Sequence, residues 1–198
     1  MYRRHETADL PEDRGGFRFR GGCVALDLAG TLQARLKPEP RDLLAEPRDV
    51  DRWLVLSGMV AVSPGATMGD LETARALREA IYALAVTLGH GAFDRSALGV
   101  LNGCAASPAA IPTLQGDGRV TLRGSVAELL ATIAREAVEL FGGADAGRIH
   151  QCQAPVCTLF FLDTSRSGER KWCSMAACGN KAKVAEFRRR KRALALGE

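Results

Sequence analysis

The sequence predicts a mainly α-helical N-terminal domain with one small β-hairpin, followed by a C-terminal treble-clef or ribbon-like zinc module made of a β-hairpin and a helix. Three observations predict this fold class. Apolar residues recur at helical spacing through most of residues 17–143. A glycine-rich linker over residues 142–147 then interrupts that pattern. Four of the six cysteines lie between Cys152 and Cys178, and a strongly basic run follows them.

The chain begins with a polar segment and two short predicted helices. Residues 1–16 are polar, and we expect a flexible N-terminal arm there. Residues 23–36 carry an apolar residue at every fourth position, and two nearby prolines end the pattern. Residues 49–62 form a second amphipathic segment, which a Ser-Pro-Gly sequence interrupts. We therefore expect both segments to be helices.

The clearest helix of the N-terminal domain is predicted over residues 70–88, where apolar residues form one stripe at 3.6-residue spacing. A shorter helix is predicted over residues 94–104. Residues 111–114 and 119–122 flank a Gln-Gly-Asp-Gly turn, which indicates a β-hairpin. Ser125 and Glu128 have the spacing of a capping box and predict the start of another helix. These elements place a helical domain at residues 17–143.

The clustered cysteines have the spacing of a metal site. Four residues separate Cys152 from Cys157 and Cys173 from Cys178, and fifteen residues lie between the two pairs. Zn²⁺ takes four thiolates in a tetrahedral arrangement, and each short loop lets two thiolates converge. The alternatives are two disulfides, which a cytosolic setting disfavours, unrelated buried thiols, and an iron–sulfur cluster. His150 lies close enough in sequence to substitute for one of the four ligands.

We predict one structural zinc ion in a module over residues 148–194. Four thiolates close the coordination sphere, so no position remains for a catalytic water. Residues 158–162 are expected to form a strand, 165–168 a turn and 170–173 the returning strand. Such a hairpin would bring the second cysteine pair back to the first. A module this small, with one short apolar strand, should not fold without its metal.

Charge is distributed unevenly along the chain. The formal net charge is +4, but residues 1–165 hold 17 Lys and Arg against 20 Asp and Glu, and residues 166–192 hold ten against two. A basic helix is predicted directly after the last cysteine. On that helix Val184, Phe187 and Leu194 share one face, which we expect to pack on the zinc hairpin. A basic end on a slightly acidic body predicts an anionic partner.

Duplex DNA is the partner that we expect for the basic end, because Lys and Arg neutralise phosphates. A helix braced by zinc and surrounded by basic side chains suits contact with a groove or a backbone. The alternatives are a solvated charged helix and a helix that only anchors the tail. Asn180 could equally contact DNA or cap a local turn. The residues predicted to contact nucleic acid are Arg170, Lys171, Asn180, Lys181, Lys183, Arg188, Arg189, Arg190 and Arg192.

Two stretches of the sequence resemble known families. Residues 172–181, Trp-Cys-Ser-Met-Ala-Ala-Cys-Gly-Asn-Lys, resemble the signature of the CGNR zinc-finger family. Residues 21–31, Gly-Gly-Cys-Val-Ala-Leu-Asp-Leu-Ala-Gly-Thr, and 75–80, Arg-Ala-Leu-Arg-Glu-Ala, resemble the ABATE domain that usually precedes it. The resemblance implies a bacterial, stress-induced transcription regulator whose zinc module is proposed to bind DNA. Lys181 replaces the signature arginine, which keeps the charge but loses the bidentate fork, and Gly30 replaces the commoner asparagine.

The N-terminal domain holds one candidate effector pocket, made of Asp27, Thr31 and Arg78. Asp27 lies in an otherwise apolar helical turn, and Arg78 flanks the apolar stripe of the 70–88 helix. Half-buried Asp and Arg residues usually pair with each other, so a structural Asp27–Arg78 pair is the first expectation. The functional alternative is a pocket for a small effector, which would make the domain a sensor. Cys23 and Cys104 are expected in the core.

Other protein classes are disfavoured by what the sequence lacks. It has no run of about 18 apolar residues, so we expect no membrane span. Its N-terminus lacks the apolar stretch of a signal peptide, so we expect a cytoplasmic protein. Common catalytic motifs are missing, so we expect no enzyme. The expected function is DNA-binding transcription regulation, with an N-terminal domain that senses an effector or forms a homodimer. A protein-interaction or RNA-binding zinc module is the alternative.

Overall fold

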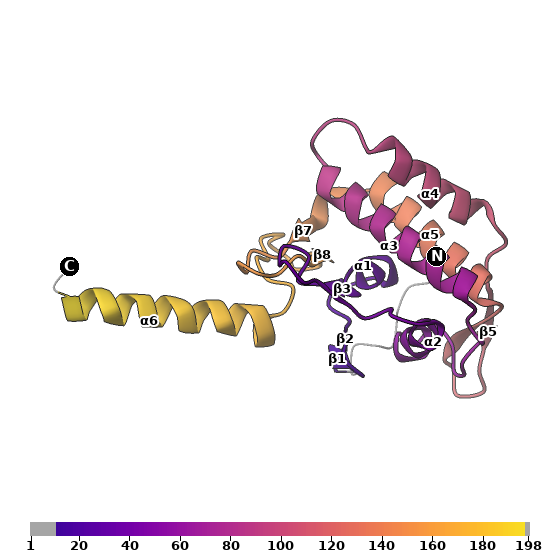
Figure 1. Ribbon diagram of the computed structural model, residues 1–198, viewed down its shortest axis with the longest axis horizontal. Helices are drawn as coiled ribbons and strands as arrows, with labels where there is room; N and C mark the ends of the chain where they lie inside the picture. The colour runs from indigo at the N-terminus through magenta and orange to yellow at the C-terminus, as the bar shows by residue number, and fades with distance from the viewer. Residues whose placement is uncertain (1–10, 197–198) are drawn as a thin grey trace.

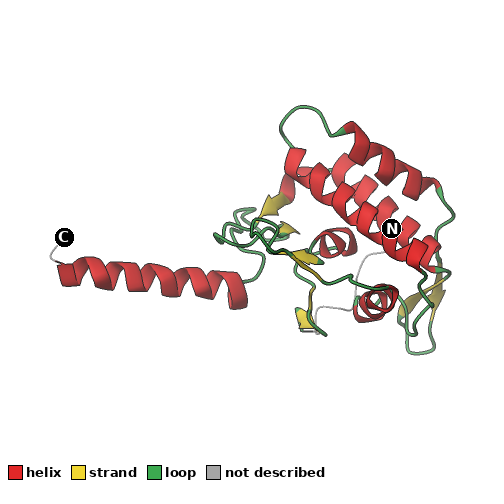
Figure 2. Cartoon of the chain, in the orientation of Figure 1, coloured by secondary structure: helices red, strands yellow, loops and turns green. Residues whose placement is uncertain are grey.

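The computed structural model describes residues 11–196 and shows a helical body from which one long helix protrudes (Figure 1). In the body, three long helices pack against one another, and two shorter helices cover them. The long helices are α3 (Met68–Thr87), α4 (Arg95–Ala106) and α5 (Val126–Gly142), and the short ones are α1 (Val24–Ala29) and α2 (Pro47–Leu56). The protruding helix is α6 (Asn180–Leu196). The N-terminal part is thus mainly helical, as the sequence predicted (Figure 2).

Each of the three long helices begins at a capped position, of which the sequence predicted the one at Ser125. Ser125 and Glu128 form a capping box at the start of α5, and Thr67 and Asp70 form another at the start of α3. The side chain of Asp94 accepts a hydrogen bond from a backbone amide in the first turn of α4. All three predicted helices are confirmed, with ends that differ by about two residues.

Helix α1 is shorter than predicted because a threonine closes its last turn. The helix covers Val24–Ala29, whereas the apolar spacing predicted a helix over residues 23–36. The Thr31 hydroxyl donates a 2.7 Å hydrogen bond to the carbonyl of Leu28, and the Thr31 amide bonds the same carbonyl at 3.0 Å. These bonds satisfy the end of α1 and let the chain continue as an extended segment.

Helix α2 ends at Leu56 and does not continue over the predicted residues 49–62. The Ser57 hydroxyl donates to the carbonyl of Leu54 at 2.8 Å, and Gly58 follows with a φ of 80°. A left-handed glycine of this kind commonly ends a helix, because only glycine adopts such a φ without strain. The apolar residues beyond it belong to a loop and not to the helix.

Short antiparallel ladders complete the described part of the fold. Each ladder joins two strands that are consecutive in the chain, and none of these ladders extends into a larger sheet within residues 11–196. The hairpin predicted after α4 is confirmed, with its second strand shifted by one residue. The pairs are β1 (Asp13–Arg14) with β2 (Phe17–Arg18), β3 (Leu32–Gln33) with β4 (Arg41–Asp42), β5 (Ile111–Leu114) with β6 (Val120–Arg123), and β7 (Ile149–Gln151) with β8 (Phe160–Leu162).

The β1–β2 ladder bears on the flexible arm expected over residues 1–16. Residues 13 and 14 pair with β2, and the Arg14 side chain donates to the carbonyl of Leu56 at 2.9 Å. The end of the expected arm is therefore part of the fold. Residues 1–10 of the arm lie outside the described residues.

One apolar core fills the body and continues into the C-terminal module. Phe160 and Ile149, from the β7–β8 ladder, are buried in the same core as the helices of the body. A second and smaller cluster forms around Cys152 and Cys173. The described helices include none that is long and apolar enough to cross a membrane.

Candidate metal centre and nucleic-acid interface

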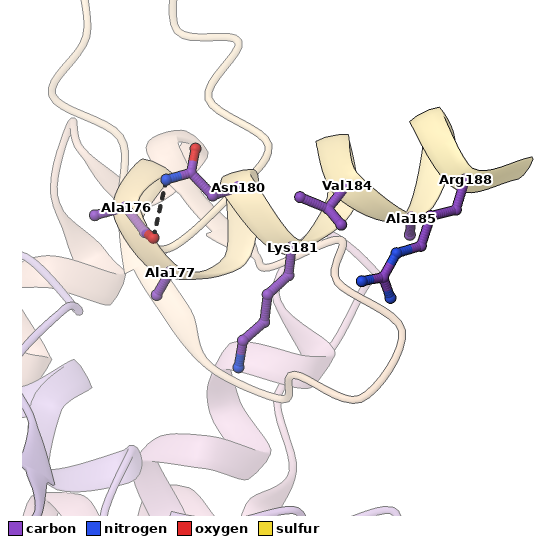
Figure 3. Close-up of a pocket in the computed structure, with 7 residues that line it drawn as sticks. All are labelled: Ala176, Ala177, Asn180, Lys181, Val184, Ala185 and Arg188. Carbon is purple, nitrogen blue, oxygen red and sulfur yellow. Dashed lines mark hydrogen bonds between the residues drawn. The ribbon is translucent and has the colours of Figure 1, made fainter. Parts of the chain in front are cut away.

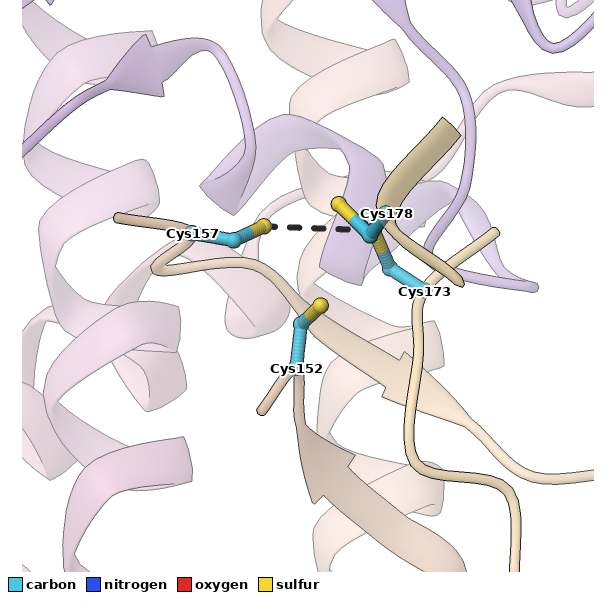
Figure 4. Close-up of side chains that lie close together, drawn as sticks. All are labelled: Cys152, Cys157, Cys173 and Cys178. Carbon is cyan, nitrogen blue, oxygen red and sulfur yellow. Dashed lines mark hydrogen bonds between the residues drawn. The ribbon is translucent and has the colours of Figure 1, made fainter. Parts of the chain in front are cut away.

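The first cysteine pair lies in the loop that joins β7 to β8. Residues 149–151 pair with residues 160–162, so the chain between them forms the loop at the end of a β-hairpin. The Cys152 amide donates to the carbonyl of Leu159 at 2.9 Å, and the Cys157 amide donates to the carbonyl of Ala154 at 2.9 Å. These bonds point both thiols toward one side of the loop (Figure 4).

The strand partner that the sequence predicted for residues 158–162 was wrong. The returning strand expected at residues 170–173 does not form; β8 pairs instead with β7, which precedes the cysteines. Only the Gln153 amide bonds the returning segment, at the carbonyl of Lys171 (3.0 Å). The three residues of β7 are too few to show an alternating pattern in the sequence, and this is why the strand was missed.

Asp163 holds the loop between the two cysteine pairs. Its carboxylate accepts hydrogen bonds from the backbone amides of Ser165 and Arg170, each 2.8 Å long. The bond with Ser165 and the bond from Arg170 lower the pKa of Asp163 to about 2. Gly168, with a φ of 66°, completes the predicted turn. The sequence analysis did not select Asp163, although an aspartate two residues before a Ser-Arg-Ser-Gly turn is typical of this kind of cap.

The second cysteine pair spans a π-helical turn, Met175–Gly179, that continues directly into α6. Ser174 caps this turn, because its hydroxyl accepts from the Ala177 amide at 3.3 Å. A Cβ atom on Gly179 would lie 2.7 Å from the Met175 sulfur and 3.1 Å from Cδ1 of Trp172, so a larger residue there would require these side chains to shift. The turn brings Cys178 back beside Cys173.

The four thiols converge at the spacing of a zinc site. Their sulfur atoms all lie within 4.8 Å of one another. Cys157 Sγ is 3.9 Å from Cys173 Sγ, which is 3.6 Å from Cys178 Sγ. A tetrahedral ion with Zn–S bonds of about 2.3 Å would separate its sulfurs by about 3.8 Å, whereas a disulfide needs about 2.05 Å. The four cysteines therefore form the site of one structural zinc ion. His150 is outside this group among the described residues, with its ring 6.1 Å from that of Phe161.

The crowding of the thiols also favours a bound cation. The hydrogen bond with Cys173 lowers the pKa of Cys157 to about 5. The hydrogen bond with Cys157 and burial raise the pKa of Cys173 well above its usual range. Burial and the neighbouring thiolate of Cys157 raise the pKa of Cys178 to about 11. A divalent cation would remove this mutual repulsion and hold all four sulfurs as thiolates.

Arg170, which was expected to contact nucleic acid, has its guanidinium at the metal centre. Its guanidinium donates to the carbonyls of Trp172 (2.8 Å) and Cys173, and lies 4.7 Å from the centre of the Phe161 ring. From the body, Arg20 interacts with the same cysteine. Burial lowers the pKa of Arg20, but Asp13 and Cys173 raise it above its usual value.

Strand β8 and the residue before it are shared between two cores. Leu159 and Phe161 pack around the cysteines, whereas Phe160 and Leu162 pack into the body. The Phe160 ring packs edge to face with the Tyr82 ring of α3 at a centroid distance of 5.5 Å. This alternation is that of a strand covered on both faces, so the zinc module and the body support each other.

Two family models match the chain. The ABATE family, described as "putative stress-induced transcription regulator", matches residues 22–144, which is more than half of the chain. The chain belongs to the ABATE family. The CGNR zinc finger matches residues 148–191, which include the four cysteines and most of α6. A comparison with curated proteins finds none that matches.

The segment over residues 21–30, at the start of the ABATE region, lies under the zinc finger. The Gly21 carbonyl accepts from the Leu162 amide at 2.8 Å. A Cβ atom on Gly22 would be 3.3 Å from Leu162, and one on Gly30 would be 2.7 Å from Leu159. In this ABATE protein, the segment therefore forms the surface on which β8 lies.

The three residues expected to line an effector pocket have partners inside the protein. Asp27 accepts from the Gly21 amide at 2.7 Å, and the Thr31 hydroxyl is used at the end of α1. Arg78 does not pair with Asp27; it makes two hydrogen bonds, of 2.6 and 3.1 Å, with the carboxylate of Asp42. Asp42 was missed because it lies in a two-residue strand 36 positions away. Cys23 is buried and Cys104 half-buried.

Helix α6 extends away from the body (Figure 1). Its main packing contacts are with the π-helical turn that precedes it. The expected packing of its apolar face on the zinc hairpin is wrong, since Val184 is 48% and Phe187 68% exposed. The side chain of Leu194 lies outside the described residues. The helix is directed outward because the turn that carries Cys178 runs straight into it.

The basic residues of α6 are exposed, but their surroundings differ. Arg189 donates twice to Glu186 at 2.9 Å, and Arg190 donates to it at 2.7 Å. Asn180 donates to the carbonyl of Ala176 at 3.2 Å and so caps the local turn. The other predicted contact residues, all exposed, are Lys171, Lys181, Lys183, Arg188 and Arg192.

Proposed function

We propose that this ABATE-family protein is a DNA-binding transcription regulator whose zinc finger presents α6 to duplex DNA. The observation that carries the proposal is the position of α6, which stands clear of the body with seven Lys and Arg against one Glu between residues 181 and 192. Phosphate neutralisation by such side chains supplies most of the sequence-independent affinity for DNA.

The zinc site supports a binding function over a catalytic one. Four thiolates fill a tetrahedral coordination sphere, so the ion has no open position for a substrate or an activated water. We therefore propose that the protein acts by binding and not by catalysis. We also propose that it acts in the cytoplasm.

A single short finger covers few base pairs, so we further propose that two copies bind together for useful specificity. Because Asp27, Thr31 and Arg78 have internal partners, we do not place an effector there.

One observation favours a second candidate function. Phe187 is 68% exposed on α6, and an aromatic side chain of this kind is common at protein interfaces. A zinc-scaffolded contact with an acidic protein surface is therefore the alternative to DNA binding.

The test is duplex-DNA binding by the zinc-loaded protein, measured by fluorescence anisotropy over a salt series. We expect log affinity to fall linearly with log salt at a slope of several, about 0.9 per phosphate contacted. Charge reversal to glutamate at Arg188, Arg189 and Arg190 should abolish binding. The matched control reverses three exposed arginines of the body, Arg41, Arg95 and Arg123, and should bind much as before. A zinc-loaded protein that binds no duplex DNA at low salt would favour the protein partner.

A further inference from the structure

We infer that α6 meets DNA with one particular side, the side that carries Lys181, Arg188 and Arg192, while the opposite side carrying Lys183 and Arg190 faces away. This inference rests on the proposed function and names the surface that performs it. Below, the first three residues are called the front of α6 and the last two its back.

Helical geometry separates the two sides. Residues turn by about 100° each, so positions 181, 188 and 192 fall within about 40° of one another. Positions 183 and 190 lie roughly opposite to them. Figure 3 shows Lys181 and Arg188 extending to the same side of the helix. Lys181 and Arg188 are seven residues apart, so their backbones are about 10 Å apart along the helix axis. This distance is close to the width of the major groove, which is about 12 Å.

A shallow hollow lies beside two of the three front cations, Lys181 and Arg188. Its volume is about 360 Å³, and its lining also includes the apolar side chains of Ala177, Val184 and Ala185. Small apolar side chains let another surface approach the helix closely. Alanine and valine also suit contact with thymine methyl groups or sugars, so an apolar lining of this kind beside two cations fits a DNA groove flanked by phosphates.

Ion pairing inside the helix distinguishes the two sides further. Glu186 holds Arg189 and Arg190 in hydrogen bonds of 2.7–2.9 Å, so the charge on the back is partly neutralised. In contrast, the contacts described for residues 11–196 include no acidic partner for Lys181, Arg188 or Arg192. A phosphate that meets the front therefore competes with no carboxylate of the protein.

A second copy of α6 is a poor occupant of this front. Between residues 181 and 192 the helix carries a net charge of +6, so two such helices laid side by side would repel each other. The body of a second copy is also a poor occupant, because acidic residues outnumber basic ones by only three over residues 1–165. The high charge density of duplex DNA matches the helix better.

The chain offers a matched pair of variants to test the inference. Lys181→Gln with Arg188→Gln neutralises the front, and Lys183→Gln with Arg190→Gln neutralises the back. Each pair removes one Lys and one Arg seven residues apart, so net charge changes equally. Both proteins would be zinc-loaded and full-length, and circular dichroism would establish that α6 remains helical.

We expect the front variant to bind duplex DNA at least tenfold more weakly, with its salt slope lowered by about 2, close to 0.9 for each lost phosphate contact. The back variant should lose less than about threefold with an almost unchanged slope. If both variants lose affinity equally, α6 binds DNA without a preferred side, so this inference fails and the proposed function stands. If the unaltered protein binds no duplex DNA, both fail.

Discussion

A Cβ atom built on Gly30 would lie 2.7 Å from Cδ2 of Leu159, so these two residues are in direct contact between the body and the zinc finger. Gly30 ends α1 in the body, and Leu159 packs around the cysteine cluster. The backbone of Gly30 has a φ of −73°, which any residue adopts. Space and not backbone conformation therefore requires a glycine at this position.

We predict that Gly30→Val weakens the docking of the zinc finger on the body. The new side chain would have to displace Leu159, and its Cβ would also come within 3.3 Å of the Asp27 carbonyl oxygen, which cannot move independently. Overpacking of this kind costs about 1–3 kcal/mol. The free energy of unfolding, measured by urea denaturation of the zinc-loaded protein, should fall by that amount.

The control for this change is Gly99→Ala in α4. No heavy atom lies within 4 Å of a Cβ built on Gly99. Alanine is better than glycine in a helix by roughly 0.5–1 kcal/mol, so this variant should be as stable as the unaltered protein or more stable. A Gly30→Val protein of normal stability would show that Leu159 can move aside at little cost.

The long helices and the zinc ligands could be predicted because their signals are local. The capping box of Ser125 and Glu128 lies within one turn, and the stripe of α3 repeats along its whole length. The cysteines of each pair are close in sequence, so two matched spacings were enough to identify the metal. Local signals of this kind do not depend on the rest of the fold.

The contacts that were missed join distant parts of the chain. Arg78 was assigned to Asp27, but its partner Asp42 becomes a neighbour only when the β3–β4 ladder forms. Similarly, Phe187 was expected to pack on the zinc hairpin but is exposed, because its spacing does not reveal that α6 leaves the body. The sequence shows which side chains could pair or pack, whereas the tertiary fold decides which of them meet.

We predict that removal of zinc destabilises the body as well as the finger. Without the metal the cysteine cluster should not hold β8 in place, and Phe160 would then leave its contact with Tyr82 in the body core. Loss of a buried phenylalanine costs about 3–5 kcal/mol. Thermal unfolding of the helices, followed by circular dichroism, should occur at a clearly lower temperature in the presence of a chelator.

Two phenylalanine variants separate this coupling from a general effect of the chelator. In zinc-loaded protein, Phe160→Ala should lower the unfolding temperature, whereas Phe187→Ala should leave it unchanged, because Phe160 is 6% and Phe187 68% exposed. The prediction is wrong if the helices of the body unfold at the same temperature with and without zinc.

Arg170 should act on zinc retention and not on DNA contact. Arg170→Gln removes the hydrogen bonds to the carbonyls of Trp172 and Cys173, which orient the segment that leads into the second cysteine pair. Loss of such supporting contacts typically weakens metal binding by about 10–100-fold. Competition with a chromophoric chelator should show this loss. The neighbouring exposed Lys171, changed to Gln, should retain zinc normally, and equal zinc affinities for the two variants would contradict the assignment.

The Arg78–Asp42 pair should stabilise the body in a pH-dependent way. Burial raises the pKa of Asp42, but the hydrogen bond from Arg78 and the Leu44 amide outweigh it and lower the pKa below its usual value. Asp42→Asn removes the carboxylate that receives two hydrogen bonds from the 4%-exposed Arg78, which keeps its 2.8 Å bond to the partly exposed Glu79. Because Asp42 itself is partly exposed, we expect a loss of about 2 kcal/mol at neutral pH, less than for a fully buried pair.

The sign of the pH effect follows from the lowered pKa of Asp42. The pair contributes fully above the pKa of an unfolded aspartate, about 3.9, and its contribution disappears as the pH falls through the lower pKa of the folded state. The difference in unfolding free energy between the unaltered protein and Asp42→Asn should therefore be constant from pH 7 to about 5 and shrink below about 4. Glu186→Gln, which removes an exposed ion pair of α6, should change the unfolding temperature little. If this difference in unfolding free energy does not shrink below a pH of about 4, Asp42 acts through its shape and not through its charge.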